Sequence, residues 1–171
     1  MDTFTLIASQ YTNEDDAIAD FEAVRSAYKD LDLMDTYDAA VITRESNGKV
    51  KIVKKVEEPM RQGAMGGLAI GLAVGALVAL FPAVAIGAGL AVGGAAGAGI
   101  GATAGHVAAG MSRSDLKDLG ELLDTGTSGL IVVAATDMEA RVEAAIQRGK
   151  DVMKKKVDLD SKSLKEQIDT L

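Results

Sequence analysis

The stretch GAGLAVGGAAGAGIGATAGH, residues 87–106, decides between two folds. Its segment GAGIGATAG (97–105) has glycine spacing similar to that of a dinucleotide-binding loop. Such a loop needs a strand before it, a helix after it and an acidic residue about 20 positions later. AIGAGLAVGGAA is a poor strand, the glycine–alanine run continues on both sides, and no Gly-Lys-Ser/Thr phosphate loop is present. The stretch therefore favours helix packing over phosphate binding.

The glycines recur every four residues, which on a helix places them along one slowly turning stripe. Without Cβ atoms two helices approach closely along such a stripe and gain dispersion contacts. Interior glycine costs about 1 kcal/mol of helix propensity, so packing must offset it. The residues predicted to pack helices and to mediate oligomerisation are Gly63, Gly67, Gly71, Gly75, Gly89, Gly93, Gly97, Gly101 and Gly105.

The glycine stripes lie in a segment, from Gln62 to Ser112, that contains no Asp, Glu, Lys or Arg. Pro82 divides it into two mostly apolar halves, each long enough as a helix to span roughly 27–35 Å, close to the hydrocarbon thickness of a bilayer. We therefore predict a helical hairpin over 61–112, transmembrane or membrane-dipping, with its tip at Phe81 and Pro82. Basic residues flank both ends (Lys54, Lys55, Arg61 and Arg113), which favours cytoplasmic termini.

Two features keep alternatives open. The tip ALFPAVAIG has no polar residue, and the second half is rich in glycine and alanine. Besides a hairpin that crosses the bilayer, the alternatives are a hairpin that dips into it without crossing and a hairpin buried inside a water-soluble oligomer. Thr103 and His106 are the polar exceptions. The favoured interpretation places His106 near a helix end at the membrane interface; the alternative is an intramembrane proton or ion group.

The flanks predict an α+β domain. TFTLIAS (3–9) is typical of a strand, and residues 12–31 of a helix that buries Ile18, Phe21, Val24, Tyr28 and Leu31, with Thr12 and Asp15 as a capping box. Residues 37–57 predict a hairpin that turns at Asn47-Gly48. After the apolar segment we expect three further elements. The first is a helix with Leu116, Leu119 and Leu123 on one side, the second a buried strand over 128–136, and the third a helix over 136–149. Thr136 and Glu139 would cap the third element and Gly149 would end it, and a weaker strand over 152–160 follows.

The segments FTLIASQYTNEDDAIADFEAVRS and SGLIVVAATDMEARVEAAIQRG form a faint repeat of strand, turn and amphipathic helix. Two such units on one sheet predict a ferredoxin-like sandwich, here with an added strand and the inserted glycine-zipper hairpin. The predicted organisation assigns 1–60 and 113–160 to the two halves of the α+β domain, 61–112 to the hairpin and 161–171 to a short helical tail, with Leu164, Ile168 and Leu171 in register.

Composition excludes several functions. The net charge of −7 and the 4% aromatic content argue against nucleic acid. Without cysteine and with one histidine, the chain has no thiolate or histidine metal cluster and no Ser-His-Asp arrangement. Capping explains the acidic residues Asp15, Asp16, Asp35, Asp38 and Asp137. We predict no enzyme activity, cofactor, metal or small-molecule substrate, and the start MDTFTLIASQ predicts no cleavable signal.

Two lysine clusters, KVKIVKK (49–55) and Lys154 to Lys156, have two interpretations. They either contact anionic lipid head groups or form a solvated strand face that protects a sheet edge, and we favour the second.

The order of these parts resembles the bacterial and archaeal predicted membrane proteins of the domain-of-unknown-function family twelve-sixty-nine. The resemblance rests on DDAIADFEAVRSAYKDLDLMDTYDAAVITRESNGKVKIVKK, the glycine-rich hairpin and DLKDLGELLDTGTSGLIVVAA. It implies a membrane protein and carries no catalytic signature. In its Ala-heavy second helix this sequence departs from the family's pattern.

The sequence thus predicts a non-enzymatic protein of the cell membrane, with both termini cytoplasmic, that forms homo-oligomers through the glycine zipper and contacts lipid. The alternative is a soluble, cytoplasmic, self-assembling protein (a ring, shell or filament) with the hairpins in its core. A third hypothesis is a ligand-binding or catalytic α+β domain that carries an anchor.

Overall fold

The computed structural model describes residues 2–33, 37–47, 50–55, 85–86, 110–125, 127–159 and 162. In chain order its elements are β1 (Asp2–Tyr11), α1 (Glu14–Lys29), β2 (Tyr37–Arg44), β3 (Val50–Lys55), β4 (Ala85–Ile86), α5 (Arg113–Thr125), β5 (Ser128–Ala135), the 3-10 turn η1 (Thr136–Met138), α6 (Glu139–Ala145) and β6 (Lys150–Leu159).

The strands form one sheet in the order β4-β3-β2-β5-β1-β6. The five longer strands are antiparallel, and β4 pairs with β3 in parallel. The β5–β1 pair joins the two flanks, because β1 lies before the apolar segment and β5 after it, in a register that runs from Phe4–Ala135 to Tyr11–Ser128. The predicted α+β class is confirmed, and both flanks build a single sheet.

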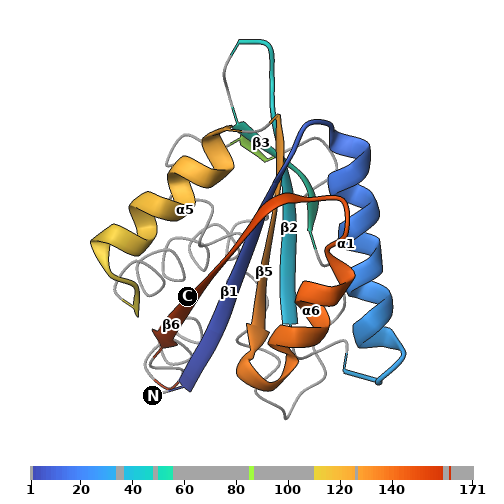
Figure 1. Ribbon diagram of the computed structural model, residues 1–171, viewed down its shortest axis with the longest axis vertical. Helices are drawn as coiled ribbons and strands as arrows, with labels where there is room; N and C mark the ends of the chain where they lie inside the picture. The colour runs from blue at the N-terminus through green and yellow to red at the C-terminus, as the bar shows by residue number, and fades with distance from the viewer. Residues whose placement is uncertain are drawn as a thin grey trace.

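The helices cover the two faces of the sheet (Figure 1). The helices α1 and α6 lie side by side on one face, and α5 lies on the other. Each unit of strand, helix and strand, β1-α1-β2 and β5-α6-β6, returns to the sheet with one strand of the other unit between its own two. The faint repeat in the sequence therefore corresponds to two interlocked units.

The strands β1, β2 and β5 are buried on both faces, which explains their nearly continuous apolar sequences. In β1, Ile7 and Tyr11 pack toward α1 and α6, whereas Leu6 and Ala8 alternate to the opposite face. The core under α1 and α6 consists of Ile7, Tyr11, Ala17, Phe21, Val24, Tyr28, Tyr37, Ala39, Val41, Leu130, Val132, Ala134, Met138, Val142 and Ile146.

An aromatic contact joins the end of α1 to the start of β2 in the β1-α1-β2 unit. The rings of Tyr28, at the end of α1, and Tyr37, at the start of β2, stack with centroids 4.0 Å apart and an angle of 11° between their planes. Both residues are fully buried or nearly so. Burial, followed by the proximity of Tyr37, raises the pKa of Tyr28 above its ordinary value.

The start of α1 differs by one residue from the prediction. Asn13, not Thr12, caps the helix: its side-chain oxygen accepts the backbone N–H of Asp16 at 2.8 Å, and its amide donates to the Asp16 carboxylate at 2.8 Å. The capping pair is therefore shifted by one residue from Thr12 and Asp15, and the Asp16 carboxylate accepts from the Asn13 side chain. Of the apolar residues predicted on one face, Phe21, Val24 and Tyr28 are buried, Ile18 is partly buried and Leu31 is exposed. Asp20 is buried beside them.

The predicted helix over 136–149 is shorter than expected. Thr136 and Glu139 form no capping box, because the Thr136 hydroxyl donates to the carbonyl of Thr3, and Glu139 pairs with Lys154. The segment begins as the turn η1, and α6 ends at Ala145. Gly149 does not end the helix. It is needed because a Cβ at this position would collide with the side chain of Ser9 on β1.

The β2–β3 hairpin is confirmed, but its turn is longer than expected. Arg44 pairs with Val50, so residues 45–49 separate the strands, and the turn is not the two-residue Asn47-Gly48 type. Outside glycine, Asp32 and Asp151 are the residues in the described ranges with positive φ, so Asn47 does not adopt the left-handed conformation that a type I′ turn requires.

Within the predicted hairpin, 61–112, the structure describes 85–86 and 110–112. Ala85 and Ile86, just beyond the predicted tip, form β4 beside Lys51 and Ile52 of β3, where we expected helix. None of the helices in the described ranges is long and apolar enough to cross a membrane.

Candidate functional site

The residues predicted to carry the function lie outside the described part of the chain. This holds for Phe81, Pro82, Thr103 and His106. It holds equally for the packing glycines, which are Gly63, Gly67, Gly71, Gly75, Gly89, Gly93, Gly97, Gly101 and Gly105. Their roles in helix packing, oligomerisation and the hairpin tip stay predictions. Within the described ranges, two other polar clusters and one groove stand out.

The first cluster surrounds the carboxylate of Asp20, which is fully buried in α1. Its Oδ2 atom accepts the Tyr11 hydroxyl at 3.0 Å and the backbone N–H groups of Arg148 and Gly149 at 2.8 and 3.2 Å. Its Oδ1 atom lies 3.4 Å from the Arg148 guanidinium. Through these contacts Asp20 anchors the loop between α6 and β6.

The same cluster changes the chemistry of Tyr11. Burial, and after it the negative charge of Asp20, raises the pKa of the Tyr11 hydroxyl far above its ordinary value of about 10. The phenol therefore stays protonated and donates to Asp20. Sequence reasoning missed this cluster, although an aspartate between Ala17 and Val24 on the apolar helix face was a usable signal.

The second cluster lies on β6, at the edge of the sheet next to β1. Lys154 contacts Glu139 at 2.9 Å and Glu143 at 3.0 Å, both on α6. Its neighbour Lys155 points to the opposite face and contacts two carboxylates of α5, Asp115 at 2.8 Å and Asp118 at 3.0 Å. Adjacent strand residues thus hold helices on both faces of the sheet.

These ion pairs shift the pKa values of the groups involved. The Lys155 hydrogen bond lowers the pKa of Asp115, and the Lys154 hydrogen bond lowers that of Glu139. The same contacts raise the pKa values of Lys154 and Lys155. In the other lysine cluster, Lys51 pairs with Glu45 and Lys54 with Glu22. Both lysine clusters therefore include intramolecular ion pairs, and the choice between lipid contact and a solvated strand face stays a prediction.

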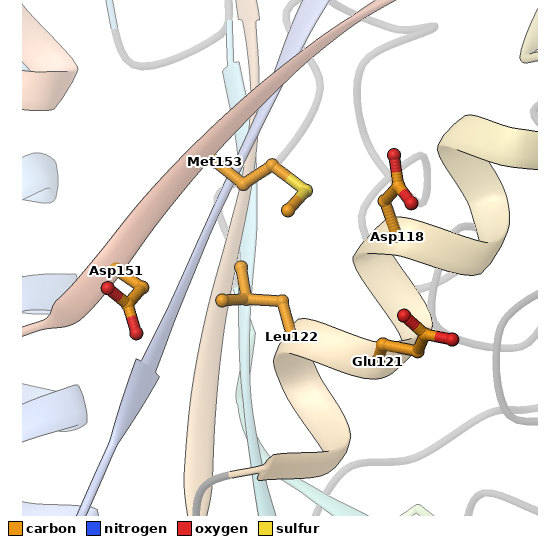
Figure 2. A pocket seen from close by; sticks show the side chains of 5 residues that line it. All are labelled: Asp118, Glu121, Leu122, Asp151 and Met153. Atoms are coloured by element: carbon orange, nitrogen blue, oxygen red, sulfur yellow. The ribbon is translucent and has the colours of Figure 1, made fainter.

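A groove lies between α5 and the beginning of β6 (Figure 2). Its volume is about 370 Å³, and it is open to solvent. Leu122 from the helix and Met153 from the strand point into it from opposite sides, and acidic side chains surround them. The lining residues are Asp118, Glu121, Leu122, Asp151 and Met153.

A bulge shapes the strand side of this groove. The pairing of β1 with β6 shifts between Ser9 and Gln10, which leaves Asp151 as the extra residue, with a φ of 52°. The amide of Gln10 donates to the Asp151 carboxylate at 3.2 Å. Asp151 therefore reaches the groove through a local irregularity of the backbone, which no sequence pattern had indicated.

In the ranges that the structure describes, no group of three or more His, Asp or Glu side chains is placed to hold a metal ion. Among the acidic residues noted in the sequence, Asp16 donates its backbone N–H to the capping residue Asn13 and lies 3.9 Å from Arg148, and Asp38 is buried in β2, where its carboxylate accepts the N–H of Ala39. Asp35 lies outside the described residues.

Comparison with known proteins identifies the family. Neither the curated proteins nor the solved structures contain a match to this chain. The family model described as "Protein of unknown function (DUF1269)" matches residues 64–169, which takes in the glycine-rich segment, α5, β5, α6 and β6. The quoted N-terminal segment of the predicted resemblance lies before the matched residues. The match extends over more than half of the sequence, so the resemblance is confirmed and the chain belongs to the DUF1269 family.

Proposed function

We propose that this protein is a non-enzymatic, membrane-associated protein that forms homo-oligomers through the glycine zipper of residues 61–112. In this proposal the hairpin inserts into the cell membrane and contacts lipid. The α+β domain remains on the cytoplasmic side with both termini, and no cofactor or small-molecule substrate takes part.

One observation carries the proposal: a single sheet contains strands from both sides of a long charge-free segment. Because β1 and β2 both pair with β5, the segment between β3 and α5 begins and ends at the same folded domain. Any excursion into a bilayer must therefore begin and end on the same side. The absence of Asp, Glu, Lys and Arg from Gln62 to Ser112 supports an apolar environment for that excursion.

The domain itself is proposed to be a ferredoxin-like sandwich with additions. The interlocked units β1-α1-β2 and β5-α6-β6 support this assignment. In this view β3 extends the sheet beyond β2, and α5 covers the face that the two other helices leave open. Its role is to hold the two ends of the hairpin together and to present a folded surface beside the membrane.

Fractionation of the expressed protein tests membrane insertion. After a carbonate wash, we expect the chain to stay in the membrane pellet and to be extracted by detergent. In a matched variant, Leu77→Lys/Val78→Lys, each lysine opposes insertion by about 2.5–3.5 kcal/mol, so this variant should leave the pellet. Recovery of the unmodified chain in the wash would contradict the proposal.

The second candidate function is the soluble self-assembling protein. The pairing of Ala85 and Ile86 with β3 favours it, because a fully spanning hairpin would hold these residues roughly 27–35 Å from the domain. In this case the chain should appear in the carbonate wash as a large particle of uniform size, which electron microscopy would image. Gly93→Leu/Gly97→Leu should reduce the particle or oligomer size in both candidates; an unchanged size in mass photometry would contradict the zipper.

A further inference from the structure

The two ends of the sheet differ in their relation to the charge-free segment. At one end β1 and β2 begin and β5 and β6 finish. We call it the insertion end, and its residues include Thr3, Tyr37, Ala135 and Asp158. The opposite end, the turn end, carries the turn between β2 and β3 with the exposed residue Ser46. In Figure 1 the N-terminus and the end of α1 lie at the insertion end, and the β2–β3 turn lies at the other.

The strand before the charge-free segment runs toward the insertion end. The first residue of β3, Val50, pairs with Arg44 beside the turn, and the last, Lys55, pairs with Ala40 farther down β2. The strand therefore leads the chain away from the turn end. Residues 56–61 alone separate it from the charge-free segment, which begins at Gln62.

The charge-free segment finishes in direct contact with the insertion end. Gly110 still belongs to this segment, which extends to Ser112. A Cβ atom on Gly110 would collide with the backbone carbonyl of Asp158 and would lie 3.0 Å from Val157 Cγ1. Because Asp158 pairs with Thr3 at the start of β1, this contact places the return of the chain at the insertion end.

We propose that the insertion end of the domain lies against the lipid surface, with Leu31 as its apolar contact, and that the turn end points away from the membrane. This inference rests on the proposed membrane insertion of the charge-free segment. Where that segment is anchored, the contact of Gly110 with β6 holds the domain beside the bilayer. A short tether of this kind keeps the local concentration of lipid at the insertion end high.

Leu31 is the side chain suited to touch lipid at this end. It is 37% exposed and follows α1, which ends at Lys29. Its backbone N–H donates to the carbonyl of Tyr28, whose ring stacks on Tyr37 at the start of β2. Apolar side chains in this position enter the boundary between head groups and acyl chains. The neighbouring exposed charges, Lys29 and Asp30, have opposite signs, so we expect the contact to form on uncharged lipid.

Quenching by lipid compares the two ends in the full-length protein. The natural chain has no cysteine, so Lys29→Cys and Ser46→Cys each carry a single fluorophore, at the insertion end and at the turn end. β2 is eight residues long, so about 25 Å of strand separates the two ends. In phosphatidylcholine vesicles with a nitroxide on a fraction of the head groups, we expect several-fold stronger quenching at position 29 than at position 46.

A matched pair of variants tests the role of Leu31. In the Lys29→Cys background, Leu31→Asp should reduce the quenching at position 29. Val152→Asp changes a side chain of the same exposure, 37%, on β6 and should leave that quenching unchanged. Equal effects of the two changes would overturn the assignment of Leu31.

A carbonate wash of the same vesicles separates this inference from the proposed function. If the labelled chain leaves the vesicles, membrane insertion itself is contradicted, and the orientation with it. If the chain stays but quenching is equal at both positions, or stronger at position 46, insertion stands and the proposed orientation is overturned. Retention together with stronger quenching at position 29 supports both.

Discussion

Asp20 and Lys155 each contact several polar partners, but Asp20 is buried whereas Lys155 and its partners are partly exposed. The Asp20 carboxylate is fully buried and accepts from Tyr11, two backbone N–H groups and Arg148. The Lys155 ammonium, on β6, is 20% exposed, and its partners Asp115 and Asp118 are 31% and 46% exposed. Water replaces lost contacts at the second site and not at the first, so burial should determine what each cluster contributes to stability.

The clusters also differ in what they join. Asp20 fixes the loop that leads from α6 into β6, so its contacts determine where that strand begins. Lys155 and Lys154 hold helices against a strand that is already paired with β1. The comparison predicts severe effects for changes around Asp20 and mild ones for changes along β6.

Asp20→Ala should have the largest effect. It leaves the buried Tyr11 hydroxyl and two part-buried N–H groups without their acceptor, which together costs about 3–5 kcal/mol of the free energy of unfolding, at about 1–3 kcal/mol for a fully buried group. Urea titration followed by circular dichroism measures this loss. Asp20→Asn is the matched control, since its amide oxygen still accepts, and it should lose less. Equal losses for both variants would show that the acceptor geometry is unimportant.

Gly149→Ala should follow. The added Cβ would meet the Ser9 side chain and lie 3.2 Å from Ile146 Cγ2, so the loop must shift at a cost of about 1–3 kcal/mol. Gly129→Ala is the comparison: there the nearest atom, at 2.7 Å, is the end of the flexible Leu123 side chain. The same titration should show a smaller loss for Gly129→Ala, and the reverse order would contradict the close approach of Gly149 to β1.

Alkaline pH should weaken the domain gradually. Burial raises the pKa values of Tyr11 and Tyr28 above about 10, so above that pH the unfolded chain releases protons that the folded chain keeps. Unfolding then releases protons, and the free energy of unfolding falls by about 1.4 kcal/mol per pH unit for each tyrosine. Tyr11→Phe/Tyr28→Phe should flatten this slope in thermal melts between pH 9 and 11. If the slope did not change, the loss of stability with pH would come from groups other than these two tyrosines.

Lys155→Met should have the smallest effect. It removes ion pairs that water partly reaches but keeps the aliphatic stem against the sheet, so the midpoint of urea unfolding should move less than in the other variants. In 1 M salt, where the Debye length is about 3 Å, the remaining difference from the unmodified chain should disappear. If Lys155→Met lowered the free energy of unfolding as much as Asp20→Ala does, burial would not explain the difference in stability contribution between the two clusters.

The sequence predicted those parts of the fold that depend on local periodicity. Alternation and apolar runs located β1, β2 and β5, and the helical spacing of Phe21, Val24 and Tyr28 located the buried face of α1. The capping prediction failed by one residue at Asn13, because both Thr12 and Asn13 are good caps and only the tertiary position of the helix distinguishes them.

The polar clusters could not be predicted, because they join residues that are distant in sequence. Asp20 on α1 contacts Arg148, which lies 128 residues later in the sequence. Lys155 on β6 contacts Asp115 on α5, and the whole of β5 and α6 lies between these two residues in the sequence. The bulge that carries Asp151 depends on the register between β1 and β6, which no local pattern specifies. Gly149 was assigned to a helix end for the same reason, since its actual neighbour, Ser9, lies on the first strand.

The side of the membrane on which each flank lies tests the central claim most directly. In Lys29→Cys and Lys117→Cys, each variant carries one exposed cysteine, on α1 before the charge-free segment or on α5 after it. Because one sheet contains both flanks, we predict that a membrane-impermeant maleimide labels neither variant in intact cells and labels both after the membrane is opened. Labelling of one flank alone in intact cells, or recovery of the unmodified chain outside the membrane fraction, would contradict a returning hairpin anchored in the membrane.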